Sequence, residues 1–264
     1  LKNKINRLSK FHQSRLIKYK QKINHDKIFK DLLKISKSIT KFSSPVWKLV
    51  NTAGDKNKFI LFEGAQGALL DIDYGTYPYV TSSNTSSGQI FAGSGFGIKK
   101  NHKVFGITKA YTTRVGSGPF PTELNNNISS YLVEKGKEYG TVTKRKRRCG
   151  WFDAIIVKQS IKISGVTDIV LTKLDVLDDL ESIKICVGYK IGNKKYDYLP
   201  SDEMLQEKIV PIYKTMFGWK KSTFGIKKWK DLPKKAQEYV LFIEKIIDTK
   251  ISIISTGPDR NQTI

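Results

Sequence analysis

Three segments of the chain place polar side chains directly after a run of apolar residues. They are EGAQG (63–67), TKLD (172–175) and STGPD (255–259). In open α/β sheets, ligands bind outside the carboxyl ends of the strands. The sequence therefore predicts a binding site in which these three segments meet.

The TKLD segment has a definite chemical use. The carboxylate of Asp175 can accept two parallel hydrogen bonds from a guanine base, one from N1–H and one from the exocyclic amino group. Adenine offers no such pair of donors, and the aliphatic stem of Lys173 can cover the face of the base. Lys and Asp are also common at strand ends, so the tetrapeptide taken alone favours an ordinary solvated loop.

The other two segments are less specific. The amide of Gln66 can both donate and accept a hydrogen bond, and the glycines around it permit close backbone approach to a ligand. An ordinary turn is the alternative. Residues 255–257 are first interpreted as a turn that ends a strand.

Five consecutive basic residues, Lys144 to Arg148, admit three interpretations. They are a nuclear-localisation or nucleic-acid patch, a solvated loop without a role, and a loop whose Arg side chains bind carboxylate or phosphate. Thr141 and Thr143 precede the run and add hydroxyl donors, while Trp151 follows it as an anchor into the core. These neighbours favour a substrate-binding loop.

Composition sets the broad class. The 264 residues are 39% hydrophobic and 11% aromatic, which is typical of a folded globular protein. The formal net charge of +23 is compatible with a polyanionic partner. Lys occurs in every segment, however, so compositional drift with Lys on solvated faces is the preferred explanation.

Two cysteines, Cys149 and Cys186, leave no room for a disulfide framework or a Cys-based zinc site, and a reducing cytoplasm is expected. No apolar run approaches the roughly 20 residues of a membrane span. The chain begins with Leu1 rather than Met, and both of its ends suggest a piece of something longer.

Hydrophobic periodicity predicts the elements that must position these residues. Residues 1–40 are expected to be helical, with a break at SSPVW (43–47). Pro233 begins a helix with Ala236, Val240, Ile243 and Ile247 on its apolar side. Residues 82–97 are expected to form a structured loop. Strands are predicted at 58–67, 103–115, 167–175, 182–191 and 250–255. Strands that alternate with helices indicate an α/β domain.

Several longer motifs occur together in a fixed order. They are LFEGAQGALLDIDYGTYPYVTSSNT (61–85), KAYTTRVGSGPFPTEL (109–124), RKRRCGWFD (145–153), LTKLDVLD (171–178) and IISTGPDR (253–260). Together they resemble the adenylosuccinate synthetase family, from about residue 58 to the end. The resemblance implies a P-loop-NTPase-like α/β fold with a central, largely parallel or mixed sheet flanked by helices. Residues 1–57 are then a helical lead-in, and 58–264 are the C-terminal part of the family's domain.

The resemblance also implies an activity. Members of this family are GTP-dependent ligases that join IMP and L-aspartate, release GDP and phosphate, and require Mg²⁺. They act in the synthesis of AMP, as cytoplasmic homodimers. Neither a membrane nor a nucleic acid is then an expected partner.

Site residues carried over from the resemblance fall into three groups. The IMP-binding residues are Gln66, Thr81, Val115 and Arg145. The aspartate-binding loop consists of Thr141, Val142, Thr143, Lys144, Arg145, Lys146 and Arg147. The GTP-binding residues are Arg147, Lys173, Leu174, Asp175, Ser255, Thr256 and Gly257.

The chain departs from the family pattern in two ways. The family's glycine-rich phosphate loop, its catalytic Asp and His, its metal-binding backbone and an arginine that crosses the dimer interface are not found, and His12 and His25 do not replace them. The chain is therefore expected to be a C-terminal portion that is inactive in isolation. In addition, Val142, Thr143 and Lys144 stand where the family usually has Thr-Thr-Gly. Loss of the glycine is expected to remove access to positive φ and to weaken binding.

One alternative comes from a different class of protein. A non-catalytic basic protein that binds nucleotides or nucleic acid would share the charge excess. Substitution of Arg147 should weaken GTP binding specifically in a synthetase, but should reduce salt-dependent polyanion binding in the alternative.

Overall fold

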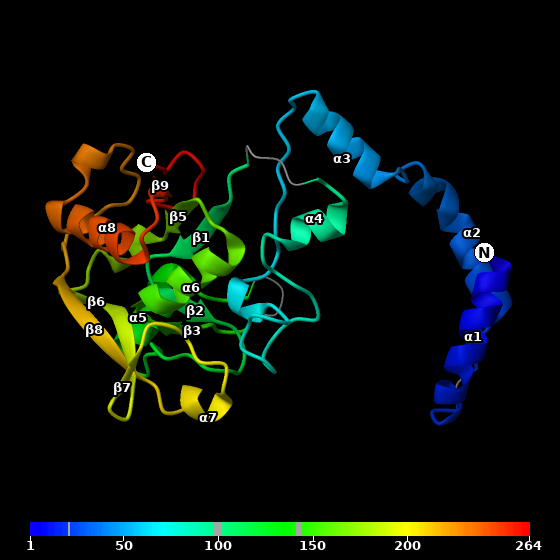
Figure 1. Cartoon of the computed structure of the whole chain (residues 1–264), viewed down its shortest axis with the longest axis horizontal. Coiled ribbons are helices and arrows are strands. Elements are labelled where there is room, and N and C mark those ends of the chain that lie inside the picture. Colours follow the sequence, from blue (N-terminus) through cyan, green and yellow to red (C-terminus); the bar gives the residue numbers. More distant parts are fainter. Residues whose placement is uncertain (21, 98–101, 141–143) are drawn as a thin grey trace. The chain divides into compact units, whose positions relative to one another are not determined.

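A computed structural model describes residues 1–20, 22–97, 102–140 and 144–264. The chain divides into two units (Figure 1). The first comprises residues 1–60 and 94–96, and the second comprises 61–93 and 97–264. Each unit is considered by itself.

The first unit is helical, as the periodicity predicts. Helices α1 (Lys2–Ile17) and α2 (His25–Thr40) contact each other, and α3 (Val46–Asp55) follows. The side chain of Asn24 accepts a hydrogen bond from the Lys27 amide at 2.9 Å and caps α2. Pro45 lies at the N-terminal end of α3, so the predicted break is where one helix ends and the next begins.

A parallel sheet in the second unit forms the frame of the candidate site. Its strands are β1 (Phe105–Lys109), β5 (Asp168–Thr172) and β9 (Ile251–Ile254), in the order β1-β5-β9. Lys109 pairs with Thr172, and Leu171 pairs with Ile254. Because all three strands run in the same direction, their carboxyl ends lie at one edge of the sheet.

Two further sheets complete the β-structure of the described residues. The strands β2 (Thr112–Arg114) and β3 (Arg148–Gly150) pair antiparallel. A four-stranded mixed sheet contains β4 (Phe152–Asp153), β6 (Ser182–Ile191), β7 (Lys194–Tyr196) and β8 (Val210–Phe217). The predicted α/β class, with parallel and mixed sheets flanked by helices, is confirmed.

Helices of the second unit bury their apolar sides against these sheets. Ala236, Val240, Ile243 and Ile247 of α8 (Lys234–Ile247) are buried, as predicted, in the same core as Leu171 of β5. The other helices are α4 (Gln89–Ser94), α5 (Asn127–Gly136), α6 (Ala154–Ser164), α7 (Glu203–Gln206) and the 3₁₀ turns Ala68–Leu70, Leu174–Leu177 and Trp229–Asp231. Among the residues described, no helix has both the length and the apolar character needed to cross a membrane.

The predicted strand at 58–67 is wrong. This segment is an irregular stretch, and the side chains of Phe59 and Leu61 are 108% and 87% exposed. A strand requires a neighbour for its backbone hydrogen bonds, and no described strand pairs with this segment. The apolar residues of this segment match the local pattern of a strand, but that pattern does not specify a neighbouring strand with which the segment could pair.

The prediction for 103–115 is only partly correct. Two strands, β1 and β2, replace the single strand, because the chain leaves the parallel sheet at Ala110 and Tyr111 and enters the antiparallel pair. Both of these residues are buried. The segment 82–97 is not purely loop, since it contains the short helix α4.

Candidate active site

The ends of β5 and β9 bring two predicted ligand-binding segments together. The Ser255 amide donates to the Leu171 carbonyl at 2.8 Å, and the Leu174 amide donates to the Ser255 carbonyl at 3.5 Å. Residues 173–175 and 255–257 therefore lie side by side at the carboxyl edge of the parallel sheet. This is the edge at which open α/β sheets bind ligands.

The segment that follows β5 changes direction at Lys173, whose φ of 60° is left-handed. Leu174 is fully buried and fixes the segment to the core. Asp175 is half-buried, and burial raises the pKa of its carboxyl group, while the cations Lys173 and Lys135 partly oppose the increase. Asp175 is thus a partly desolvated carboxylate held on a rigid turn.

The segment that follows β9 is fixed by its own hydrogen bonds. The buried hydroxyl of Thr256 donates to the carbonyls of Ile226 at 2.9 Å and Gln262 at 3.1 Å. The hydroxyl of Ser255 donates to the Gly257 carbonyl at 2.8 Å. A Cβ atom at Gly257 would collide with the side chain of Gln262. The Thr256 hydroxyl therefore holds the turn in place, and Gly257 allows it to close.

The basic run does not form a uniform patch. The guanidinium of Arg148 pairs with the Glu123 carboxylate and donates to the carbonyls of Gly116 at 3.1 Å and Gly118 at 2.9 Å. Arg147 turns toward a different carboxylate, that of Glu138, at 2.9 Å. These two arginines therefore have separate structural partners, whereas the Lys146 side chain is exposed.

The base of the predicted aspartate loop is a narrow hairpin. The Gly140 amide donates to the Arg145 carbonyl at 2.8 Å, and the Lys144 amide donates to the Gly140 carbonyl at 2.9 Å. Lys144 adopts a φ of 54°. The expectation that loss of glycine removes positive φ is therefore wrong, because the hairpin imposes this conformation on a lysine. Thr141, Val142 and Thr143 lie outside the described residues.

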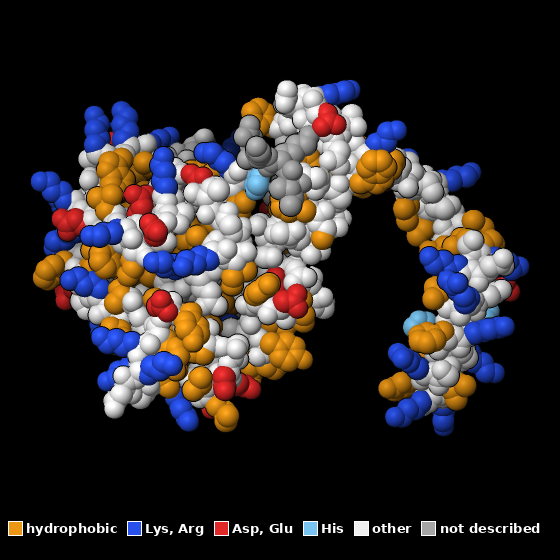
Figure 2. Space-filling view, in the orientation of Figure 1, with side chains coloured by type: hydrophobic (Ala, Val, Ile, Leu, Met, Phe, Trp, Pro, Cys, Tyr) orange, Lys and Arg blue, Asp and Glu red, His pale blue; other side chains and the backbone are white. Residues whose placement is uncertain are grey.

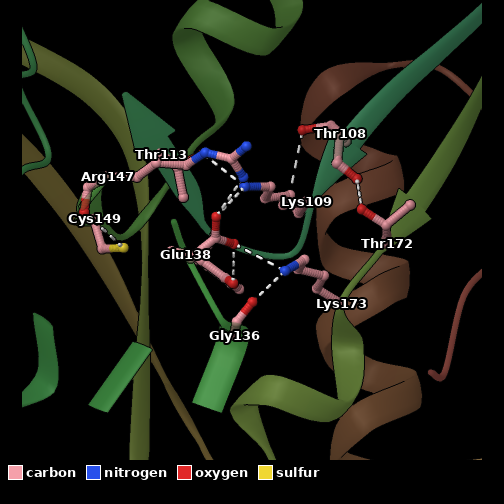
Figure 3. A network of polar contacts seen from close by, with 10 residues as sticks. Thr108, Lys109, Thr113, Gly136, Glu138, Arg147, Cys149, Thr172 and Lys173 are labelled. Carbon is pink, nitrogen blue, oxygen red and sulfur yellow. Dashed lines mark hydrogen bonds and ion pairs between the residues drawn. The ribbon is translucent and has the colours of Figure 1, made fainter. Parts of the chain in front are cut away.

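Glu138 connects the aspartate loop to the parallel sheet (Figure 3). One carboxylate oxygen, Oε2, accepts from Lys109 Nζ at 2.7 Å and Arg147 Nη1 at 2.9 Å. The other, Oε1, accepts from Tyr111 at 2.5 Å and lies 3.1 Å from Lys173 Nζ. Hydrogen bonds and ion pairs with these groups hold the pKa of Glu138 at about 2, although burial opposes the decrease.

The predicted IMP-binding segments are organised by a buried arginine. Arg114 donates from Nη2 to the Thr76 hydroxyl at 2.8 Å and to the Tyr79 carbonyl at 3.2 Å. Its Nε donates to the Ser117 carbonyl at 3.0 Å. Arg114 thereby ties the loop before Thr81 to the turn that begins with Val115.

Asp71 shapes the same loop from its other side. Its Oδ2 accepts from the amides of Thr85 at 2.5 Å and Ser86 at 3.1 Å, and its Oδ1 accepts from those of Asp73 and Tyr74. These backbone donors lower the pKa of Asp71 to about 2. The loop is therefore folded around a single ionised carboxylate.

Some of the predicted site residues thus contact one another or share a partner in the structure. Lys173 and Asp175 lie beside Ser255–Gly257, and Arg147 joins Lys173 through Glu138. Thr81 is half-buried and its amide donates to the Leu70 carbonyl at 2.8 Å. By contrast, Gln66 and Val115 are exposed, as is Arg145.

Sequence reasoning missed four residues that hold the site together: Lys109, Glu138, Arg114 and Asp71. One signal for Glu138 was present, because it is an acidic residue only six positions before the five-residue basic run. Lys109 and Arg114 lie at the ends of β1 and β2, where polar side chains often face a ligand. Their partners are distant in sequence, so the pairing required the fold.

Figure 2 bears on the excess of positive charge. On the face that it shows, Lys and Arg side chains are scattered among apolar and neutral groups and do not form one continuous stripe. This arrangement matches the expectation of Lys on solvated faces.

No metal centre is evident in the described part of the chain, where no three His, Cys, Asp or Glu side chains converge on a position suited to a metal ion.

Comparison with known proteins gives a consistent result. The family model described as adenylosuccinate synthetase matches residues 1–264, including residues 1–57, for which the motifs gave no resemblance. An adenylosuccinate synthetase of Ehrlichia canis (strain Jake) is 51% identical over an alignment of 269 residues, which covers 100% of this chain and 62% of the relative.

Two solved structures are similar. The fully ligated adenylosuccinate synthetase of Plasmodium falciparum superposes with a TM-score of 0.92 at 40% identity, over 99% of this chain and 63% of that one. A cyanophage S-2L succinoaminodeoxyadenylate synthetase bound to dGMP and dATP gives a TM-score of 0.51 at 19% identity, over 83% of this chain and 49% of that one, and shows the fold alone.

The chain spans less than two thirds of the length of these relatives. The interpretation of the chain as a C-terminal portion stays a prediction. The match of the family model over the whole chain, together with the structural similarity, settles its relationship: the chain belongs to the adenylosuccinate synthetase family.

Proposed function

We propose that this chain forms the GTP-binding and aspartate-binding part of an adenylosuccinate synthetase. In the proposed reaction, O6 of IMP attacks the γ-phosphate of GTP, an O6–P bond forms and GDP leaves. The amine of L-aspartate then attacks C6, and the C6–O6 bond breaks with release of phosphate. Phosphorylation converts a poor leaving oxygen into a good one.

One observation carries the proposal. The two predicted GTP-binding segments, 173–175 and 255–257, are joined by the hydrogen bond that the Leu174 amide donates to the Ser255 carbonyl at 3.5 Å. Segments that are distant in sequence thus border a single position at the carboxyl edge of the sheet. This arrangement supports a base-binding site there.

Asp175 suits the recognition of guanine. Its carboxylate accepts from N1–H and from the 2-amino group, and partial burial strengthens both hydrogen bonds relative to bulk water. The stem of Lys173 covers one face of the base, while the turn at Ser255–Gly257 covers its edge.

Arg147 and Lys173 add positive charge beside this position. Their side chains are 29% and 33% exposed, so each faces the solvent on one side and Glu138 on the other. A carboxylate or phosphate of a substrate can approach the exposed side. Residues 141–147 stay predicted contacts of aspartate. The predicted contacts of IMP stay Gln66, Thr81, Val115 and Arg145.

The residues of this chain are proposed to bind and orient the substrates. No catalytic acid or base is assigned to them, and the 264-residue chain by itself is expected to bind GTP without forming adenylosuccinate. The requirement for Mg²⁺, the homodimer and the cytoplasmic location are also proposed from the resemblance.

An exchange of base specificity tests the proposal. The Asp175→Asn side chain offers one acceptor and one donor, which match N1–H and O2 of xanthine but not the two donors of guanine. We expect the affinity of the chain for GTP to fall by at least about tenfold and its affinity for XTP to rise. Asp179→Asn is the matched control, because Asp179 is an exposed carboxylate paired with Lys135 at 3.0 Å. Titration with ribose-labelled fluorescent nucleotides measures both affinities.

Two outcomes would contradict the proposal. Equal affinities of the unaltered chain for GTP and ATP would remove the evidence for guanine recognition. If substitution of Arg147 instead reduced binding of single-stranded nucleic acid with a changed salt dependence, the alternative of a non-catalytic polyanion-binding protein would be favoured.

A further inference from the structure

Glu138 is a buried carboxylate whose partners come from three parts of the fold (Figure 3). Lys109 is the last residue of β1, Lys173 follows β5, and Arg147 precedes β3. Their nitrogens lie 2.7, 3.1 and 2.9 Å from the carboxylate oxygens, respectively. One side chain thus connects three elements that otherwise belong to two sheets.

The cluster carries more positive than negative charge. Three cations surround one carboxylate, and the pKa of Lys109 is lowered by burial and by the charges of Lys173 and Arg147, although Glu138 opposes this decrease. Without the carboxylate, the three cations would repel one another at short range in a poorly hydrated site. The positions of Lys173 and Arg147 therefore depend on Glu138.

Glu138 also fixes the base of the loop through its backbone. Its carbonyl accepts from the Arg147 amide at 2.9 Å, and its amide donates to the Val133 carbonyl at 2.8 Å. Lys173 Nζ in addition donates to the carbonyl of Gly136, two residues before Glu138. The start of the loop and the turn after β5 consequently share one anchor.

We propose that Glu138 is a positioning residue that couples the aspartate loop to the guanine-binding turn by holding Arg147 and Lys173 on the two oxygens of one buried carboxylate. The proposal rests on the function proposed above. A ligand that draws Arg147 away from Glu138 changes how strongly the carboxylate attracts Lys173. A ligand that moves Lys173 changes the attraction of Glu138 for Arg147 in the same way. Because such coupling is reciprocal, occupation of either segment changes the affinity of the other.

A double-mutant cycle on GTP affinity tests this coupling. Glu138→Gln keeps the shape of the side chain and removes its charge, and Arg147→Met removes the guanidinium. We expect Glu138→Gln to weaken GTP binding by about tenfold. Arg147→Met should also weaken GTP binding. We expect the factor by which it does so to be at least about threefold smaller in the Glu138→Gln background than in the unaltered chain.

The control variant is Glu181→Gln. Glu181 is an exposed carboxylate paired with Lys220 at 2.8 Å, and neither residue belongs to the group formed by Glu138 and its three cations. In this background the effect of Arg147→Met should be unchanged. A role of Glu138 in stability alone would lower the melting temperature but leave the two substitutions additive, so the cycle separates positioning from stability.

Lysine acylation followed by mass spectrometry gives a second readout at Lys173. GTP should protect Lys173 from acylation in the unaltered chain, and this protection should fall at least about threefold in Glu138→Gln. Glu138→Asp, which keeps the charge but shortens the reach, should restore part of the protection. If Glu138→Gln does not fold, Glu138→Asp takes its place in the cycle and is expected to show non-additivity of the same sign but of smaller size.

The outcomes distinguish the two proposals. An unaltered chain that does not prefer GTP to ATP would refute the proposed function itself. A preference for GTP combined with additive effects and unchanged protection of Lys173 would leave that function standing and overturn the role of Glu138.

Discussion

Arg114 Nη2 lies 2.8 Å from the hydroxyl oxygen of Thr76, 38 residues earlier in the chain. Both side chains are buried, and the same guanidinium nitrogen also donates to the Tyr79 carbonyl. The loop that contains the predicted IMP-phosphate ligand Thr81 is thereby attached to the end of β2. A long-range polar contact therefore helps to hold this part of the candidate site.

Arg114→Gln should destabilise the second unit. The substitution leaves the Thr76 hydroxyl and two backbone carbonyls without a charged donor, and we expect the free energy of unfolding to fall by about 1–3 kcal/mol. Urea denaturation followed by tryptophan fluorescence measures the change. Arg7→Gln, at an exposed position of α1, is the control and should change stability by less than about 0.5 kcal/mol. Equal effects of the two substitutions would contradict the attachment.

Asp71 should make the stability of its loop depend on acid pH. Its pKa in the folded chain is about 2, below the ordinary value of 3.8, so its ionised form stabilises the fold above pH 4 and this contribution is lost as the pH falls toward 2. Asp71→Asn should lower the free energy of unfolding by about 1–2 kcal/mol at neutral pH and flatten this part of the pH profile.

Asp73→Asn serves as the comparison for Asp71. Asp73 is exposed and accepts from the Asn84 side chain at 2.6 Å, without the backbone donors that Asp71 collects. Urea denaturation between pH 3 and pH 7 should therefore give nearly the same profile for Asp73→Asn as for the unaltered chain. A loss of stability in Asp73→Asn as large as in Asp71→Asn would rule out the special role of Asp71.

GTP affinity should decrease in acid through Asp175. Only the ionised carboxylate can accept two hydrogen bonds from guanine, and burial raises the pKa of Asp175 above its usual value of 3.8. Binding should therefore be fully present well above this raised pKa and be lost as the pH falls through it. Fluorescent-GTP titrations across the acid range measure the decrease, and Asp175→Asn should remove it. A decrease of the same size in Asp175→Asn would assign the titration to another group.

Lys144→Gly should increase stability, in contrast to an ordinary substitution by glycine. Lys144 has a φ of 54°, and the left-handed region costs a non-glycine residue about 1–2 kcal/mol, which exceeds the entropic cost of glycine. We expect a gain of about 0.5–1 kcal/mol in the free energy of unfolding, measured by urea denaturation. Lys146→Gly, two residues later and without positive φ, should instead lose about 0.5–1 kcal/mol. A loss in both variants would argue against strain at Lys144.

The basic run, Lys144 to Arg148, shows which features of the site could be predicted from the sequence and which could not. The motifs around it identified the family, but they did not indicate that Arg147 and Arg148 pair with different carboxylates, those of Glu138 and Glu123. The sequence did not indicate that Arg147 faces a buried carboxylate. Nor did it indicate that Lys144 keeps the backbone conformation expected of the glycine that it replaces.

Local patterns determined much of the secondary structure. The helices at α1, α2 and α8 and the strands β5, β6 and β9 follow from periodicity and from β-branched residues, because these signals depend on neighbours in sequence. The segment 58–67 has the same local signal for a strand but no described partner, and it is irregular. A strand depends on hydrogen bonds to another segment, which its own residues do not specify.

The sequence by itself therefore determined the α/β class, the family and the segments that carry polar side chains at strand ends. Only the tertiary structure decided which of these side chains share a partner. The carboxyl ends of β1, β5 and β9 must lie at one edge of a sheet before Lys109 and Lys173 can reach the same carboxylate. Electrostatic interactions of this kind depend on distance in space and on burial, and neither is a local property of the chain.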